Sequence, residues 1–314
     1  MGISKTNIDF FNKNILNVEK FLWDIDKIEI YTENNKDKKI LTFKNNNQKL
    51  FSLIRNYDLY NFLFSTLRKD KLIQFKKKLT YLNLTKNDYK LIFNCDFNNS
   101  VSKKFFYKKI EKDYKSSAYI TTFKHKKLNN NTASQIFTKK GPLAFLPVSS
   151  TETSVVYSAR GNKNIKFNEL IKKYNTKYKI SKINNFLSLE LNSSNLRSYY
   201  NGNIIAFGDL LHKLHPLAGQ GFNMTIRDIK KIHELIKFKL DHGLDLDVSI
   251  CSDFEKSTKN KNYLFSNGID FIYEFFNFEN KINNNTLSKS VKFLGKNKTI
   301  NKVFANIADN GIVI

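Results

Sequence analysis

The chain has 314 residues, of which 41% are hydrophobic, and it carries a formal net charge of +25. This length is enough for a large buried core and for two domains. The charge alone would suggest nucleic acid or an acidic membrane as partner, but lysine is scattered along the whole chain beside asparagine runs, which indicates a general bias in residue usage and disfavours a dedicated nucleic-acid surface.

Cysteine usage and hydropathy exclude further classes of protein. Cys95 and Cys251 are the only cysteines and lie far apart, so neither a disulfide framework nor a thiolate metal site is indicated. No apolar run approaches the ~20 residues that span a bilayer, and the N-terminus does not resemble a secretory signal. We expect a cytoplasmic protein that can lie peripherally on the inner membrane face, because its positive charge attracts acidic lipids.

The first third of the chain predicts both strands and helices. Residues 27–31 and 39–43 predict a hairpin, residues 58–67 a helix, and residues 89–93 a strand. Arg55 precedes the predicted helix and could reach a phosphate, although an ordinary surface arginine is the preferred interpretation.

The middle of the chain predicts an antiparallel sheet followed by a helix. Residues 118–123, 135–138 and 155–158 predict strands, and the polar residues 149–153 between two apolar runs predict a longer hairpin loop. Residues 167–174 predict a helix. Three histidines are interpreted as surface or helix-terminal residues: His125, His233 and His242.

The most informative stretch is Gly208 to Asn223, G-D-L-L-H-K-L-H-P-L-A-G-Q-G-F-N. Residues 204–207 are continuously apolar, which predicts a buried parallel strand that ends at Gly208-Asp209. Asp209 is therefore expected at the carboxyl end of a strand, where a carboxylate can accept hydrogen bonds from ribityl or ribose hydroxyls. A proline, two glycines and an amphipathic helix follow, so the positive end of that helix would face the space that the glycines leave. This arrangement suits an anionic or electron-rich ligand and predicts a flavin site.

The same stretch resembles the second flavin motif of the aromatic-ring monooxygenases with a p-hydroxybenzoate-hydroxylase-type fold, above all the UbiH-like ubiquinone-biosynthesis hydroxylases. The family pattern is G-D-A-A-H, two residues, H-P-x-A-G-Q-G-x-N and an R-D pair, and only Leu210 and Leu211 depart from it. A fainter likeness covers residues 141–147 and 154–158, which resemble strands of the family's substrate-side sheet. The alternative interpretation is a glycine-rich turn before an ordinary surface helix.

The resemblance implies an FAD-dependent monooxygenase that uses NAD(P)H and hydroxylates the aromatic ring of a polyprenylated phenol in ubiquinone biosynthesis. It implies a mixed α/β fold, in which a partial Rossmann-like FAD-binding domain is interleaved with an antiparallel substrate-side sheet. Residues 45–105 and 201–245 would be the flavin-binding segments, residues 25–44 and 106–200 the substrate-side sheet, and residues 246–314 a C-terminal helical region.

The resemblance also implies a set of cofactor-binding residues: Asp96, Gly208, Asp209, His215, Pro216, Ala218, Gly219, Gln220, Gly221, Phe222 and Asn223. No catalytic residue is assigned. No metal is expected, because no acidic or cysteine ligand completes the pair His212 and His215. The implied partners are a lipophilic quinone precursor and either a membrane surface or a ubiquinone-biosynthesis complex, without nucleic acid.

Two features depart from the family pattern. The chain contains no G-x-G-x-x-G turn, which in the family holds the pyrophosphate of FAD, so we expect a truncated chain or a fragment that lacks a βαβ unit. Phe97 stands in N-C-D-F-N-N-S where the family has a glycine, so either the loop takes another path or the site is weakened.

Two rival functions follow from these departures. The first is a non-catalytic remnant or partner subunit of such a hydroxylase. The second is a basic nucleic-acid-binding module, although no helix-turn-helix, zinc or stacking motif supports it.

Overall fold

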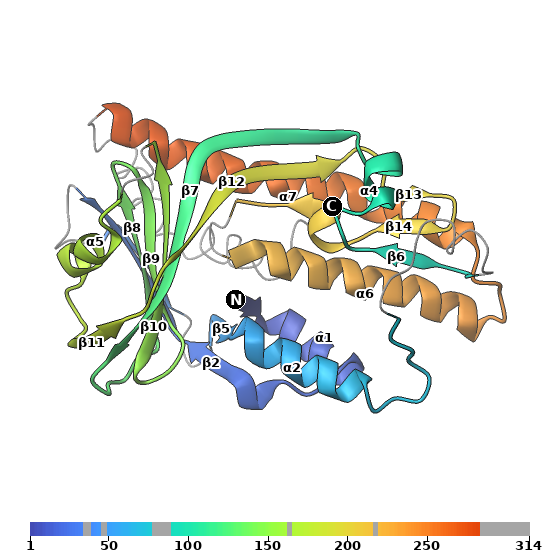
Figure 1. The fold of residues 1–314 in the computed structure, drawn as a ribbon, viewed down its shortest axis with the longest axis horizontal. Coiled ribbons are helices and arrows are strands. Elements are labelled where there is room, and N and C mark those ends of the chain that lie inside the picture. Colours follow the sequence, from blue (N-terminus) through green and yellow to red (C-terminus); the bar gives the residue numbers. More distant parts are fainter. Residues whose placement is uncertain (34–38, 45–48, 77–88, 162–164, 216–218, 283–314) are drawn as a thin grey trace.

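The computed structural model describes residues 1–33, 39–44, 49–76, 89–161, 165–215 and 219–282. They form a mixed α/β fold, as predicted, with three sheets and the helices shown in Figure 1. The helices are α1 (Lys5–Asn14), η1 (Glu19–Phe21), α2 (Asn56–Leu67), α4 (Ser100–Phe105), α5 (Phe167–Tyr174), η3 (Gly208–Leu210), α6 (Gln220–Asp241) and α7 (Val248–Ile282). None of these described helices is both long and apolar enough to cross a bilayer.

The largest sheet has nine strands in the order β15-β12-β7-β10-β9-β8-β3-β4, and β11 also pairs with β7. The strands are β3 (Lys27–Thr32), β4 (Leu41–Lys44), β7 (Lys109–His125), β8 (Thr132–Thr138), β9 (Gly141–Pro147), β10 (Glu152–Arg160), β11 (Ile180–Ile183), β12 (Leu187–Leu196) and β15 (His212–Lys213). All pairings are antiparallel except that of β3 with β8. The predicted hairpin and the three predicted strands of this sheet are confirmed.

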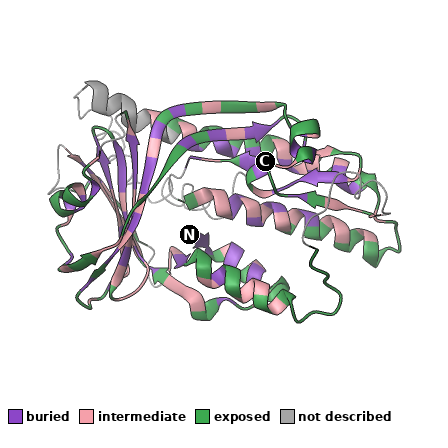
Figure 2. Ribbon diagram, viewed as in Figure 1, coloured by how far each residue is buried: buried purple, intermediate pink, exposed green. Residues whose placement is uncertain are grey.

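The two faces of the large sheet have different neighbours, because side chains alternate along each strand. One face packs against α5 through a core that includes Phe145, Tyr157 and Phe167. On the opposite face Ile120, Ala144 and Val156 are direct partners across three neighbouring strands. Figure 2 shows this alternation as buried and half-buried positions along the strands.

A second, smaller sheet carries the strand that leads into the predicted flavin motif. Its order is β13 (Tyr200–Asn201), β14 (Ile204–Ala206) and β6 (Ile92–Asn94), and β14 runs parallel to β6. The apolar strand predicted at residues 204–207 is confirmed, and β14 is buried together with Ile232 of α6 and Phe254 of α7. The strand predicted at residues 89–93 begins three residues later, because the ladder with β14 starts at Ile92.

The N-terminal segment forms the third sheet and lies on the other side of α6 (Figure 1). The strands of this sheet are β1 (Gly2–Ser4), β5 (Phe51–Ile54) and β2 (Leu22–Ile25), in that order. Ile226 of α6 packs against Ile3 and Ile8 in the core of this layer. Helix α6 is therefore packed against the N-terminal layer and the β14 sheet.

The structure decides the predictions made for His125 and for Phe97. His125 was expected at the surface, and this is wrong: it is buried at the end of β7, where Nε2 meets the Thr153 hydroxyl at 3.1 Å and Nδ1 meets the Lys126 carbonyl at 2.9 Å. Phe97 is exposed and does not adopt a positive φ, because Lys115 is the only described non-glycine residue that does. The loop around Phe97 therefore takes a path that a bulky residue can adopt.

Gly141, at the start of β9, should tolerate no side chain. Its φ is +139°, and a Cβ there would lie 1.9 Å from the Ser158 carbonyl oxygen of β10. We expect Gly141→Ala to lower the free energy of unfolding by roughly 3 kcal/mol, from backbone strain and overpacking together. Urea denaturation measures this loss.

Gly161→Ala is the matched control for that substitution. Gly161 also has a positive φ, +82°, but a Cβ there would meet nothing within 4 Å. Gly161→Ala should therefore lower the free energy of unfolding by only about 1 kcal/mol, from backbone strain alone. Equal losses for the two variants would contradict the steric explanation.

Candidate flavin site

The turn after β14 is shaped by two glycines in the left-handed region. Gly208 has a φ of +62° and begins the 3₁₀ helix η3 at the carboxyl end of the strand. Gly219 has a φ of +63° and is the N-cap residue of α6. L residues with a Cβ rarely adopt such angles, which explains why glycine occupies both positions. Pro216 and Ala218, also predicted as cofactor-binding, lie outside the described residues.

The N-terminus of α6 is open to a ligand. Among the described residues no side chain caps it, and its first turn contains no acidic residue. A Cβ at Gly221 would meet no described atom within 4 Å. The unpaired first-turn amides therefore present positive partial charge there.

One buried polar atom at this helix end also indicates a ligand. Oε1 of Gln220 is buried and has no hydrogen-bond partner among the described residues. Buried acceptors are normally satisfied, so a bound group with an N–H or O–H donor would complete this one. The residues present thus fit the flavin ring, which has both an electron-rich edge and a hydrogen-bond donor.

Two carboxylates stand at the same edge of the β14 sheet. Asp209 is exposed directly after β14, and its side chain makes no hydrogen bond to the other described residues. Asp96 follows β6, whose Asn94 is paired with Ala206 of β14, so both carboxylates follow the ends of adjacent parallel strands. Asp96 Oδ1 accepts a 2.8 Å hydrogen bond from the Asn98 amide, which partly commits it to its own turn. Asp209 is therefore the more available acceptor.

Two predicted residues use their side chains to attach α6 to the N-terminal layer. The Asn223 Oδ1 accepts 2.9 Å hydrogen bonds from the Ser4 amide and from Asn7 Nδ2, and its own Nδ2 donates to the Gly2 carbonyl. Phe222 packs in the apolar core of that layer. Because these two side chains are occupied, only the backbone atoms of Phe222 and Asn223 are available to a cofactor. Their role in cofactor binding stays a prediction.

A buried pair fixes the other side of α6. His212 of β15 and Asp228 of α6 are 2% and 1% exposed, and their Nε2 and Oδ2 atoms are 2.5 Å apart. Asn262 of α7 donates to the second oxygen of Asp228 at 3.0 Å. The sequence pattern contained His212 and Asp228 without giving them a role, and no local signal marked Asn262, which is 34 residues from Asp228.

His215 joins the motif to the large sheet. Its buried imidazole lies edge-on to the ring of Tyr114 on β7, with 4.9 Å between the ring centroids. Burial lowers the pKa of His215 to about 4, and the positive charges of Lys112 and Arg160 act in the same direction. The imidazole is therefore neutral at pH 7, so it adds no positive charge to the site.

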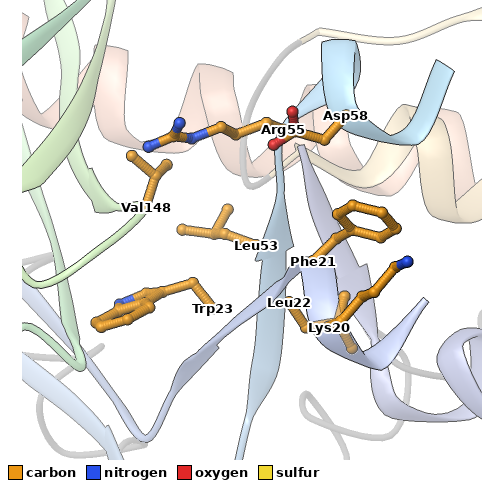
Figure 3. A pocket seen from close by; sticks show the side chains of 8 residues that line it. All are labelled: Lys20, Phe21, Leu22, Trp23, Leu53, Arg55, Asp58 and Val148. Atoms are coloured by element: carbon orange, nitrogen blue, oxygen red, sulfur yellow. The ribbon is translucent and has the colours of Figure 1, made fainter. Parts of the chain in front are cut away.

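A cavity of about 190 Å³ lies at the N-terminal sheet, beside β2 and β5 (Figure 3). Trp23, Leu53 and Val148 form its apolar wall, and Arg55 extends across it. Arg55 is paired with Glu152, so the structure supports the interpretation of a surface arginine rather than a phosphate ligand. None of the residues that line this cavity belongs to the predicted flavin site.

Comparisons with known proteins identify the class of fold. No protein-family model matches the chain. The p-nitrophenol 4-monooxygenase PnpA from Pseudomonas putida has a TM-score of 0.75 at 9% identity, covering 100% of this chain and 89% of its own. A variant of Klebsiella pneumoniae HpxO complexed with FAD also has a TM-score of 0.75 at 9% identity, covering 98% of this chain and 89% of its own. The chain thus has the fold of the FAD-dependent monooxygenases.

Sequence similarity indicates a narrower group within the FAD-dependent monooxygenases. The chain is 23% identical over 276 residues to the mitochondrial ubiquinone biosynthesis monooxygenase COQ6 of Schizosaccharomyces pombe, which covers 71% of this chain. It spans 57% of the length of that relative. The chain is similar in sequence to a ubiquinone-biosynthesis monooxygenase, and the predicted resemblance is confirmed.

The buried pair predicts a large stability effect for Asp228→Ala. This change leaves His212 Nε2 and the Asn262 amide buried without an acceptor, so we expect a loss of about 2–4 kcal/mol in the free energy of unfolding. Glu234→Ala on the same helix is the control, because Glu234 forms only an exposed ion pair with Lys231 and should change stability by less than about 1 kcal/mol. Similar losses for both variants in urea denaturation would contradict the role of the pair.

His215 predicts that stability falls in acid. Its folded pKa of about 4 lies below the ordinary 6.5, so only the unfolded chain gains this proton between these pH values. Stability from this group is present above pH 6.5 and decreases toward pH 4, by up to about 3 kcal/mol. Urea denaturation from pH 7 to 4 should show a shallower decline for His215→Gln than for the exposed control His233→Gln. Identical slopes would be evidence against this assignment.

Proposed function

We propose that the chain carries the flavin-ring part of an FAD-dependent monooxygenase that hydroxylates the aromatic ring of a polyprenylated phenol. The observation that carries this proposal is the uncapped N-terminus of α6, with the buried Gln220 Oε1 beside it and Asp209 at the end of β14. The likeness to the COQ6 relative supports the choice of substrate class.

In this proposal the residues hold and orient the cofactor. Bound FAD, reduced by NAD(P)H, supplies the oxygen-transfer chemistry. Asp209 accepts hydrogen bonds from hydroxyls of the ribityl chain, and the first-turn amides of α6 stabilise negative charge at the N1 and C2 oxygen edge of the ring. His215 stays neutral and adds no positive charge beside the ring.

The large sheet has an exposed apolar surface, and this surface favours a lipophilic substrate. Leu187 is paired with Ile120, and Leu189 with Ala118, so these four side chains lie on the face opposite α5. Leu187 and Leu189 are 69% and 57% exposed, which is unusual for two leucines on one strand face. In our proposal this face covers the polyprenyl tail. The net charge of +25 also favours association with an acidic membrane surface or a ubiquinone-biosynthesis complex, where such a precursor would be encountered.

A non-catalytic partner of such a hydroxylase is the second candidate function. The hydrogen bond from the Asn98 amide to Asp96 Oδ1 favours it, because this carboxylate is then less available to a cofactor. The two candidates differ in flavin binding, so the same experiment separates them.

Flavin titration tests the proposal in two forms of the protein. The chain as printed should bind FAD more weakly than micromolar, because several charge-assisted hydrogen bonds to the dinucleotide are absent from it and each is worth about 1.5–3 kcal/mol. A fusion with the G-x-G-x-x-G segment of a UbiH-like hydroxylase should be yellow and should oxidise NAD(P)H faster with a prenylated phenol.

Asp209→Ala in the fusion should lose most of the flavin, whereas Asp245→Ala, an exposed control in the loop after α6, should retain it. Unchanged flavin content in Asp209→Ala would contradict the assigned role. A fusion that stays colourless with excess FAD would favour the non-catalytic partner.

A further inference from the structure

A second cavity, of about 100 Å³, lies between the large sheet and the turn that follows α5. Ser134, Ile136 and Phe145 form its floor, since they point to the α5 face of β8 and β9. Gln135 and Ala144, which alternate with them, point to the opposite face, where the flavin motif lies. The cavity is therefore separated from the candidate flavin site by the thickness of the sheet.

One wall of this cavity is held rigidly by Tyr178. Its ring lies 5.2 Å from that of Phe123 and 4.7 Å from that of His125. Its hydroxyl donates a 3.0 Å hydrogen bond to Asn130 Oδ1, and Asn130 is fully buried. The side chain of Asn175 accepts hydrogen bonds from the amides of Lys177 and Tyr178, at 3.2 and 2.8 Å, which fixes the turn. The wall is thus preorganised.

The acidic side chains around the cavity already have partners. Glu29 is paired with Lys27 and Lys39 at 2.5 and 2.7 Å and also accepts from Tyr31. Glu33 is paired with Lys173 and accepts a 2.6 Å hydrogen bond from Tyr174. Neither carboxylate is left to attract a cationic ligand.

Lys177 is the cation without such a partner. Its ammonium donates to the neutral Asn130 Oδ1 at 3.3 Å, and no ion pair of Lys177 is found in the described part of the chain. Lys177 is exposed, and partial shielding by its neighbours lowers the pKa of its ammonium against the opposing effect of the Glu29 charge. An anion beside it would gain a direct charge interaction.

The floor also contains hydroxyls that are free to bind a ligand. Within the described residues, no side-chain hydrogen bond is found for Thr132 or Ser134, although both line the cavity. Ile136, Phe145 and the rings of Tyr31, Tyr174 and Tyr178 add apolar and aromatic surface. The paired Glu29 and Lys173, with Asn175 and Thr176, complete the lining. This combination suits a flat ligand with one charged end.

We propose that this cavity is a binding site for a small planar carboxylate, with its ring against Ile136, Phe145 and the tyrosine rings and its carboxylate at Lys177. A cavity of roughly 150 Å³ accepts a benzene ring, so about 100 Å³ admits one ring that is only partly enclosed. The charged end then lies at the open mouth beside the lysine. Charge-assisted hydrogen bonds from the ammonium and the hydroxyls fix its orientation.

Calorimetric titration of the full chain with sodium benzoate tests this site. We expect about millimolar affinity for this small ligand and at least about tenfold weaker binding to Lys177→Gln. Lys182→Gln is the matched control, because it removes the same charge from exposed β11 outside the cavity. Benzyl alcohol, which has the ring without the charge, should bind at least about tenfold more weakly than benzoate.

Several outcomes would overturn the proposal. They are no benzoate binding by the unaltered chain, equal binding by Lys177→Gln and Lys182→Gln, and equal binding of benzyl alcohol and benzoate. Ser134→Ala provides a second variant on a different element and should weaken benzoate severalfold, with thermal unfolding as the check on its fold. Because the cavity and the flavin motif lie on opposite faces of the sheet, Asp209→Ala should leave benzoate affinity unchanged, so this site can fail or succeed independently of flavin binding.

Discussion

The candidate flavin site depends on how the first two turns of α6 are held. Asn223 attaches this helix to the N-terminal layer through hydrogen bonds to β1 and α1. One turn later, Asp228 attaches it to β15 and α7 through His212 and Asn262. Because these groups are buried, each lost partner would leave an unsatisfied polar atom, which keeps the helix in one position. The open amides at its N-terminus therefore have a fixed direction in space.

The large sheet divides the molecule into two environments. Its period-two alternation sends one set of side chains toward α5 and the other toward the flavin motif. On the motif side, Tyr114 meets His215 and the exposed leucines of β12 continue the apolar surface. On the α5 side, aromatic side chains surround the second cavity and its unpaired lysine. A single sheet can thus support two chemically different sites without contact between them.

Much of the candidate site could be predicted because its signals are local. The apolar run before Gly208, the glycines of the turn and the amphipathic helix are adjacent in sequence, and their conformations follow from backbone sterics and periodicity. The strands of the large sheet were predictable for the same reason. The ends of the helices and strands were less predictable. For example, β6 begins later than expected, because its pairing with β14 decides where the strand starts.

The sequence by itself determined the alternating strands, the strand-turn-helix motif and the family resemblance, because each depends on residues within a few positions of one another. Only the tertiary structure decided which side chains are available to a ligand. The Asn223 side chain is hydrogen-bonded to residues 216 to 221 positions away, whereas Asp209 remains available. His125 and His215 became buried, and His215 acquired its low pKa, through neighbours that folding brought together. Burial and charge at a site are sums over spatial neighbours, and a linear pattern does not contain them.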